Sequence, residues 1–161
     1  MAETPKKAGS RERVRGYLEA HGLHEHITEF EQSTKTAQQA ADAMGCELGQ
    51  IVKSLVFLVD DRPVVALVPG DRRGDPDAIA GLMGGGQARM ADAEAVRAAT
   101  GYAIGGVSPF DLPADLPVFA DESLRRFEIV FPAAGTPTSM VRMHLTDMIA
   151  LSHARTARVA H

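Results

Sequence analysis

The chain has 161 residues, of which 45% are hydrophobic and 24% charged, and this length fits one domain of ordinary size. Near-average apolar content and a formal net charge of -4 exclude disorder of the body of the chain and argue against a protein held on nucleic acid by charge alone. Cys46 is the single cysteine, which excludes a disulfide scaffold, and no run approaches the roughly 20 apolar residues that span a bilayer. No apolar segment follows the charged N-terminus, so we expect no signal peptide and a cytoplasmic protein that contacts neither membrane nor DNA.

The first quarter of the chain predicts two helices and a short strand behind a polar leader. Residues 1–9 are predicted to be a mobile leader, and residues 10–161 to form a single domain. In chain order, the predicted elements are a helix at 11–20 capped by Ser10 and ended by Gly22, an edge strand at 26–30, and a helix at 37–44 opened by the capping box of Thr36 and Gln39.

The middle of the chain predicts a β-hairpin followed by two helices. The runs 50–59 and 63–69 are rich in Val and Leu, and Asp60-Asp61-Arg62 forms the turn between them. Asp75-Pro76 opens a helix that ends at the glycines 84–86, because a capping side chain and a proline favour the first helical turn. Asp92 caps a further helix at 93–99.

The C-terminal half combines an ordered loop at 102–113 with three predicted strands. The strands lie at 116–120, 127–131 and 139–143, and Asp121 and Thr146 are candidate caps of short helices. Strands and helices are interleaved, and a hairpin also occurs. The sequence therefore predicts an α+β (mixed α/β) fold, in which helices surround one twisted mixed sheet.

Lys53 is the first candidate functional residue, because it lies within an apolar strand and shares a face with Ile51, Leu55 and Phe57. A lysine in such a position is costly unless it has a partner or lines a cleft. One interpretation is an edge strand whose lysine reaches water. The other is a cation at the floor of a pocket that binds an anionic or carbonyl group. We expect its ammonium to open to a cleft edged by Gly105 and Gly106.

The loop Gly105-Gly106-Val107-Ser108-Pro109-Phe110 is the second candidate. Adjacent glycines allow the backbone to approach a ligand closely and to point N–H groups at it, as in an oxyanion hole. The alternative is an ordinary structural turn. The loop is not a phosphate loop, because the Gly-Lys-Ser/Thr ending is missing.

Other chemistry-bearing residues give weaker signals. His21, His24 and His26 are clustered, but no Cys, Asp or Glu completes a metal site at usual spacing, so neither a metal nor another cofactor is expected. Cys46 is expected to be structural, and Ser108 lacks the Gly-x-Ser-x-Gly pattern of a serine nucleophile.

Several segments together resemble the YbaK/ProX family of trans-editing aminoacyl-tRNA deacylases, which are similar to the editing insertion domain of prolyl-tRNA synthetase. The similarity runs from about residue 10 to the end, and the lysine strand and the Gly-Gly-x-Ser-Pro loop are its most specific parts. The segments are Thr36-Ala37 with Ala40-Ala41 and Gly45, 50–57, 66–71, Gly101-Tyr102 with 105–110, and 121–124.

The resemblance implies hydrolysis of the ester that joins a wrong amino acid to a tRNA 3′ end, without metal, cofactor or protein nucleophile. In the family, the lysine that matches Lys53 is essential, and the loop that matches Gly105–Pro109 surrounds the amino acid and its carbonyl. Asp111 stands where many members have glycine. We expect Lys53 and Gly106 to be catalytic. The residues expected to contact substrate are Phe30, Thr34, Ser54, Gly105, Val107, Ser108, Pro109, Phe110, Gly135 and Thr138.

The expected partners are the 3′ end of a mischarged tRNA, for example tRNA for proline carrying a small wrong amino acid, and prolyl-tRNA synthetase. Two alternatives stay open. One is a catalytically silent module of the same fold that only binds tRNA or a synthetase, and the other is a hydrolase of small esters.

Overall fold

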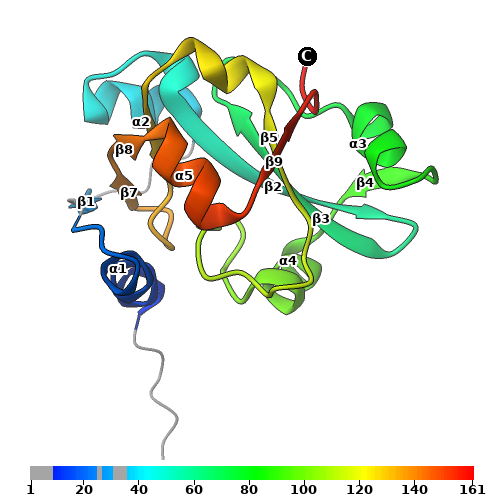
Figure 1. Ribbon diagram of the computed structural model, residues 1–161, viewed down its shortest axis with the longest axis horizontal. Helices are drawn as coiled ribbons and strands as arrows, with labels where there is room; N and C mark the ends of the chain where they lie inside the picture. Colours follow the sequence, from blue (N-terminus) through cyan, green and yellow to red (C-terminus); the bar gives the residue numbers. More distant parts are fainter. Residues whose placement is uncertain (1–8, 25–26, 31–35) are drawn as a thin grey trace, which may run out of the picture.

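Figure 1 shows the computed structural model, which describes residues 9–24, 27–30 and 36–161. A curled mixed sheet lies at its centre, and helices are packed around it (Figure 1). The α-helices of these ranges are α1 (Ser10–Ala20), α2 (Ala37–Met44), α3 (Pro76–Leu82), α4 (Ala93–Thr100) and α5 (Leu145–Ser152), and the 3₁₀ turns are η1 (Leu48–Gln50) and η2 (Glu122–Arg126). The strands are β1 (Ile27–Glu29), β2 (Ile51–Val59), β3 (Arg62–Pro69), β4 (Ala88–Met90), β5 (Val118–Asp121), β6 (Ile129–Pro132), β7 (Ser139–Val141), β8 (Met143–His144) and β9 (Arg155–Ala157).

The main sheet has the order β8-β6-β2-β3-β5-β9, and β4 also pairs with β2. Strands β2 and β3 form an antiparallel hairpin, whereas the pairs β2–β6, β3–β5 and β5–β9 are parallel. A separate two-stranded sheet joins β1 to β7. This arrangement confirms the predicted α+β class with a mixed sheet.

The central hairpin turns where the sequence predicts it. Val59 pairs with Arg62, and the two residues between them, Asp60 and Asp61, have φ of 49° and 71°. Positive φ at both positions is the requirement of the type I′ hairpin turn, and Asp tolerates it better than most residues.

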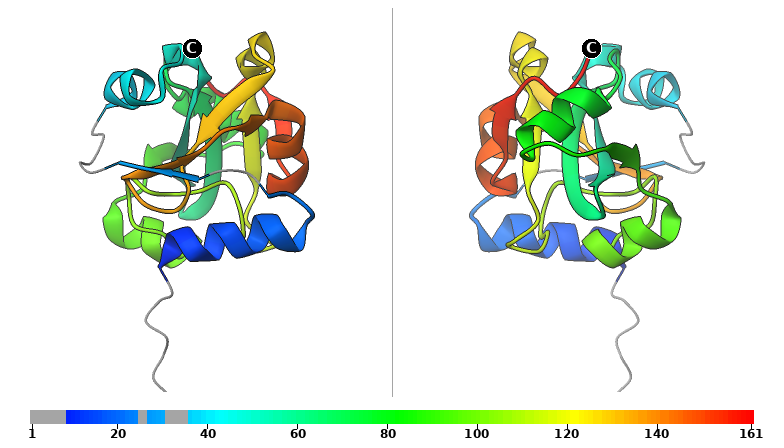
Figure 2. Two further views of the ribbon diagram at one scale, coloured as in Figure 1. Left: turned by 90° about the vertical axis from the view of Figure 1, so that its left-hand side faces the viewer. Right: turned by 90° about the vertical axis from the view of Figure 1, so that its right-hand side faces the viewer.

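Alternate residues of β2 face different parts of the core. Val52 and Val56 pack in the cluster that holds α1, α4 and α5, while Phe57 packs with Ile79 of α3. Ile51 belongs to a smaller cluster with α2. Figure 2 shows α1 crossing below the strands in both views. The strand therefore has packed residues at both ends and on both sides.

Helix caps account for most of the correct boundaries. Thr36 and Gln39 form the predicted capping box, and the side chains of Asp75, Asp92 and Asp121 accept N–H bonds at the starts of α3, α4 and η2. Side-chain caps of this kind satisfy amides that have no partner within the helix.

Some predicted boundaries are wrong. Ser10 is the first residue of α1, and Gly9 takes the N-cap position without a side-chain bond. The cap of α5 is His144 and not Thr146. The strand predicted at 139–143 is interrupted at Arg142 into β7 and β8, and the sequence did not indicate β4 or β9. The leader up to residue 8, His26 and Thr34 lie outside the described residues. In the part of the chain that the structure describes, no helix is long and apolar enough to cross a membrane.

Candidate functional site

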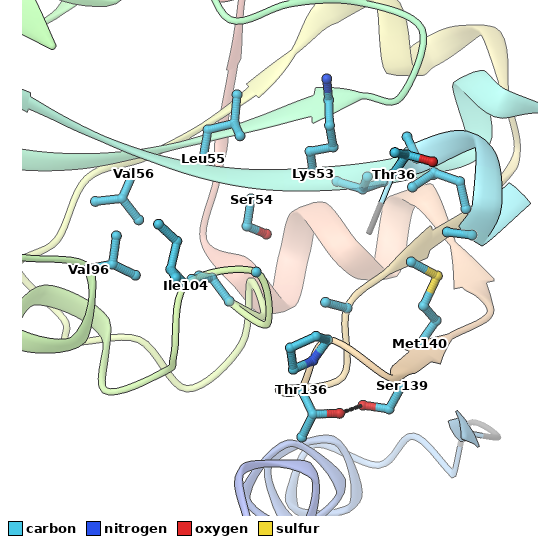
Figure 3. Close-up of a pocket in the computed structure, with 18 of the residues that line it drawn as sticks. Thr36, Lys53, Ser54, Leu55, Val56, Val96, Ile104, Thr136, Ser139 and Met140 are labelled. Atoms are coloured by element: carbon cyan, nitrogen blue, oxygen red, sulfur yellow. Dashed lines mark hydrogen bonds between the residues drawn. The ribbon is translucent and has the colours of Figure 1, made fainter. Parts of the chain in front are cut away.

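A cavity of about 330 Å³ lies between the middle of β2, the loop before Val107 and the turn that leads into β7 (Figure 3). Its size is at the lower end of the range for ligand pockets, about 300–1,000 Å³. Most of its wall is aliphatic. The lining residues are Thr36, Ala37, Ala40, Ile51, Val52, Lys53, Ser54, Leu55, Val56, Met90, Ala91, Val96, Ile104, Gly105, Val107, Ala133, Thr136, Pro137, Ser139 and Met140.

The cavity follows a gap in the pairing of β2. Strand β6 pairs with β2 only at Ile51 and Val52, and β4 pairs with it only from Phe57 onward. The amide of Ala91 closes the far end of the gap by donating to the Val56 carbonyl at 3.0 Å. Between these two contacts no strand of the described residues covers this edge of β2, and the cavity lies beside it.

Ser54 lies at the middle of this uncovered edge. Its hydroxyl oxygen is buried and has no hydrogen-bond partner among the described residues. Figure 3 shows the side chains of Ser54 and Val56 on the side of β2 that faces Ile104 and Thr136. A buried polar atom without a partner is uncommon and marks a place where a ligand or water can bind.

Lys53 borders the cavity, but its side chain points away from the Ser54 side of the strand (Figure 3). Its ammonium donates to the carbonyl of Arg72 at 2.7 Å. Burial lowers the pKa of Lys53, the charge of Arg73 lowers it further, and Asp71 opposes both effects. The ammonium therefore does not open toward Gly105 and Gly106 as expected from the sequence. It lies beside the basic segment that contains Arg72 and Arg73.

The glycine-rich loop contributes Gly105 and Val107 to the cavity wall. Gly106 does not line it, and its amide donates to the carbonyl of Ala103 at 2.9 Å. A Cβ at Gly106 would lie 2.8 Å from the backbone of Thr136, so this glycine permits two loops to pack together. This geometry does not support Gly106 as a free oxyanion donor.

The second half of the loop is part of the core. Ser108 and Phe110 have no exposed surface, and the Tyr102 hydroxyl donates to the Phe110 carbonyl at 2.6 Å. Pro109 borders a different cavity. Asp111 has φ of 59°, the conformation that glycine adopts easily, and its carboxylate pairs with Arg13. Core contacts therefore fix the second half of the loop, and only its first half lines the cavity.

The remaining expected contacts are divided between the cavity and its surroundings. Phe30 packs against the α2 cluster and does not line the cavity, nor does Gly135. The hydroxyl of Thr138 donates to Glu29 at 3.2 Å, outside the cavity. Sequence reasoning missed Thr136 and Ser139, whose hydroxyls lie 2.6 Å apart in the lining.

The described lining carries almost no charge. It includes no Asp or Glu, and Lys53 is its one charged residue. Among the residues that the structure describes, no group of three or more His, Cys, Asp or Glu side chains could hold a metal ion. Burial raises the pKa of the Cys46 thiol, and this cysteine is not part of the lining. The wall suits a small group with one or two polar atoms.

Comparison with known proteins finds relatives over most of the chain. The family described as aminoacyl-tRNA editing domain matches residues 31–151. The uncharacterized protein YwhH of Bacillus subtilis (strain 168) is 37% identical over 131 residues, which are 81% of this chain and 83% of YwhH. EbsC of Enterococcus faecalis (strain ATCC 700802 / V583), a candidate Cys-tRNA(Pro)/Cys-tRNA(Cys) deacylase, is 26% identical over 125 residues, covering 77% of this chain and 76% of EbsC. A crystal structure of a candidate trans-editing enzyme for prolyl tRNA synthetase is similar at 40% identity with a TM-score of 0.87, and the match covers 99% of each chain.

Proposed function

Because the chain belongs to the aminoacyl-tRNA editing domain family, we propose that it hydrolyses the ester of a mischarged aminoacyl-tRNA, acting in the cytoplasm as a free-standing editing factor. Its proposed substrate is tRNA for proline that carries a small wrong amino acid. The observation that carries the proposal is the small and largely aliphatic cavity beside the uncovered edge of β2, whose described lining contains one charged residue, Lys53. Such a wall accepts the side chain of a small amino acid and leaves the ester near polar groups of the strand.

Hydrolysis of this ester requires no nucleophilic side chain of the protein. Water attacks the ester carbonyl, the bond to the ribose oxygen breaks, and the free amino acid and the tRNA 3′ hydroxyl are released. A neighbouring ribose hydroxyl is positioned to assist the attacking water. The protein then contributes by orienting the ester, since correct placement of reacting groups lowers the barrier substantially.

Lys53 is assigned to the nucleic-acid side of the substrate. Its ammonium lies on the opposite side of β2 from Ser54 and next to Arg72 and Arg73, where a terminal phosphate could replace the Arg72 carbonyl as its partner. A compact ammonium binds phosphate well as a point charge. The cavity itself would hold the aminoacyl group.

Selectivity would come from the size of the cavity. One methylene changes binding in an apolar pocket by only about 1–3 kcal/mol, which is why a second, editing pocket improves the accuracy of aminoacylation. Met140, Val96 and Val107 are among the apolar residues that line the cavity. We therefore expect alanine, serine, cysteine or 2-aminobutyrate to be released faster than larger groups.

A second candidate function is a binding module without catalysis. The observation in its favour is that both residues expected to be catalytic already donate hydrogen bonds within the protein. The Lys53 ammonium donates to the Arg72 carbonyl, and the Gly106 amide donates to the Ala103 carbonyl. A binding module would protect the mischarged tRNA from spontaneous hydrolysis, whereas an enzyme would accelerate its hydrolysis.

The test is a deacylation screen of the purified protein against tRNA charged with alanine, cysteine, serine, threonine, 2-aminobutyrate or proline. Each reaction is run with and without prolyl-tRNA synthetase, and the same amino acids are also offered as free methyl esters. Single-turnover cleavage of a small aminoacyl-tRNA supports the proposal. Binding without cleavage supports the module, and cleavage of the free esters at the same rate supports a small-ester hydrolase.

A further inference from the structure

We propose that Ser54 binds the α-ammonium group of the aminoacyl moiety, through its side-chain hydroxyl and its main-chain carbonyl. This inference rests on the proposed function, because it assumes that an aminoacyl ester enters the cavity. It assigns the amino end of the substrate to the uncovered edge of β2, and the amino-acid side chain to the aliphatic wall opposite.

The direction of the Ser54 backbone follows from the register of β2. In an antiparallel strand, the N–H and C=O of one residue point to the same edge, and successive residues alternate between edges. The Ile51 carbonyl accepts the Gly70 amide on the β3 side, whereas the Val56 carbonyl accepts the Ala91 amide on the other side. Ser54 lies two residues before Val56, so its N–H and C=O point to the same edge as those of Val56. Its carbonyl therefore points to the edge that β6 and β4 leave uncovered.

The side chain of Ser54 faces the same cavity. Val52 and Val56, its neighbours on this side of the strand, are buried, so the hydroxyl is a polar atom in an apolar wall. It is buried without a hydrogen-bond partner among the described residues. Leaving such a group unpaired costs free energy in the empty protein, and a ligand that supplies a donor regains it.

The other polar side chains of the described lining already have partners. Thr36 accepts the amide of Gln39, Thr136 and Ser139 bond to one another at 2.6 Å, and Lys53 donates to Arg72. None of the described lining residues is a carboxylate. An ammonium has three donors and no acceptor, so it requires acceptors, and Ser54 offers two at the same place.

The test measures the preference for the amino group directly. The probes are two stable analogues of a charged 3′ end, 3′-alanylamino-3′-deoxyadenosine and its propionyl counterpart, which differ only in the α-amino group. Their dissociation constants are measured by calorimetry for the wild type, Ser54→Ala and Ser54→Thr. The matched control is Ser152→Ala, since Ser152 is a buried serine outside this cavity whose hydroxyl donates to the Ile149 carbonyl at 3.3 Å.

We expect the wild type to prefer the alanyl analogue, and Ser54→Ala to reduce that preference by about 10-fold or more, because hydrogen bonds to charged groups are among the stronger ones. Ser54→Thr keeps the hydroxyl and should keep most of the preference. Thermal melting should show Ser54→Ala to be at least as stable as the wild type, whereas Ser152→Ala should be less stable with an unchanged preference. A merely structural serine would give the opposite pattern.

Two results would overturn the inference in distinguishable ways. If the wild type cleaves mischarged tRNA and Ser54→Ala retains the full preference for the alanyl analogue, the assignment of Ser54 is wrong and the proposed function stands. If the wild type cleaves no mischarged tRNA and binds neither analogue, the proposed function fails and the role of Ser54 fails with it.

Discussion

Replacing Lys53 by methionine separates its role in the substrate site from its role in the fold. Methionine keeps most of the apolar stem and removes the ammonium, which donates one hydrogen bond to the Arg72 carbonyl. Two effects on stability oppose each other. The hydrogen bond is lost, and so is the cost of burying a charge beside Arg73. We expect the free energy of unfolding to change by no more than about 1–2 kcal/mol, an ordinary value for a point mutation.

The effect of Lys53→Met on activity should be much larger. If the ammonium holds the terminal phosphate, its loss lets the ester move, and misplacement of reacting groups by about 1 Å can cost about a hundredfold in rate. Lys53→Arg should not restore activity, because a planar guanidinium does not replace a compact ammonium. The assay is single-turnover deacylation of a mischarged tRNA, with urea unfolding in parallel. The control is Arg62→Met, which removes one positive charge from the exposed start of β3.

The same variant has a signature in the pH dependence of stability. Burial lowers the pKa of Lys53 in the folded state below its ordinary value of 10.5. Between the two pKa values the unfolded chain holds more protons, so the stability of the wild type rises with pH relative to that of Lys53→Met. A folded Lys53→Met protein that deacylates at nearly the wild-type rate would refute the assignment of this lysine to substrate binding.

Two further variants test the packing around the site, with Gly81→Ala in α3 as a control, and a titration tests the burial of Tyr102. Gly106→Ala should lower the melting temperature, because the new Cβ would lie 2.8 Å from the Thr136 backbone. At Gly81 a Cβ would meet nothing within 4 Å, so Gly81→Ala should raise the free energy of unfolding by about 0.4–1 kcal/mol, as measured by urea unfolding. Met140→Ala should widen the cavity and shift deacylation toward larger amino acids, which is measured as the ratio of single-turnover rates for two aminoacyl-tRNAs. The same change should lower the free energy of unfolding by about 2–5 kcal/mol, because Met140 is buried, and thermal melting measures this loss. Burial raises the pKa of Tyr102 to about 12, so its ultraviolet titration should be absent near pH 10 and the protein should lose stability as pH rises from the ordinary tyrosine value of 10 through 12.

The sequence predicts best those parts of the fold that interactions between neighbouring residues determine. A capping side chain or a two-residue turn acts within four residues, and Thr36, Asp75, Asp92 and Asp60-Asp61 all behave as expected. Strands β4 and β9 have three residues each and exist through their pairing with β2 and β5. No local pattern marks them, because pairing partners distant in sequence decide their conformation.

The position of the cavity was predicted more accurately than the residues that line it. The sequence indicated that the pocket lies between the Lys53 strand and the glycine-rich loop, and both line the cavity. Alternation along β2 also indicated that Lys53 and Ser54 face opposite ways. It could not indicate which side meets the cavity, since that depends on where β6 stops and β4 starts. Lys53 was singled out because a charged residue is unusual in an apolar strand, whereas Ser54 was expected to contact substrate only through the family resemblance.

The glycine pair illustrates the same difficulty. Adjacent glycines show that something approaches the backbone closely, and the structure confirms a close approach at Gly106, whose neighbour is the backbone of Thr136. Sequence alone does not distinguish a ligand from another loop, because both require the same missing side chain. Because the Gly106 amide already donates to the Ala103 carbonyl, the structure shows a packing contact at this glycine and does not show a free N–H donor.

The position of Lys53 is compatible with the cavity only if the substrate lies across the edge of β2. A strand that is paired on both edges separates its two faces completely, but no strand in the described part of the chain pairs with one edge of β2 between Val52 and Val56. An aminoacyl group beside Ser54 and a phosphate beside Lys53 can then belong to one molecule that crosses this edge. The short pairing of β6 and the late start of β4 are therefore the features of the fold on which the proposed activity depends, and neither is a feature of any single residue.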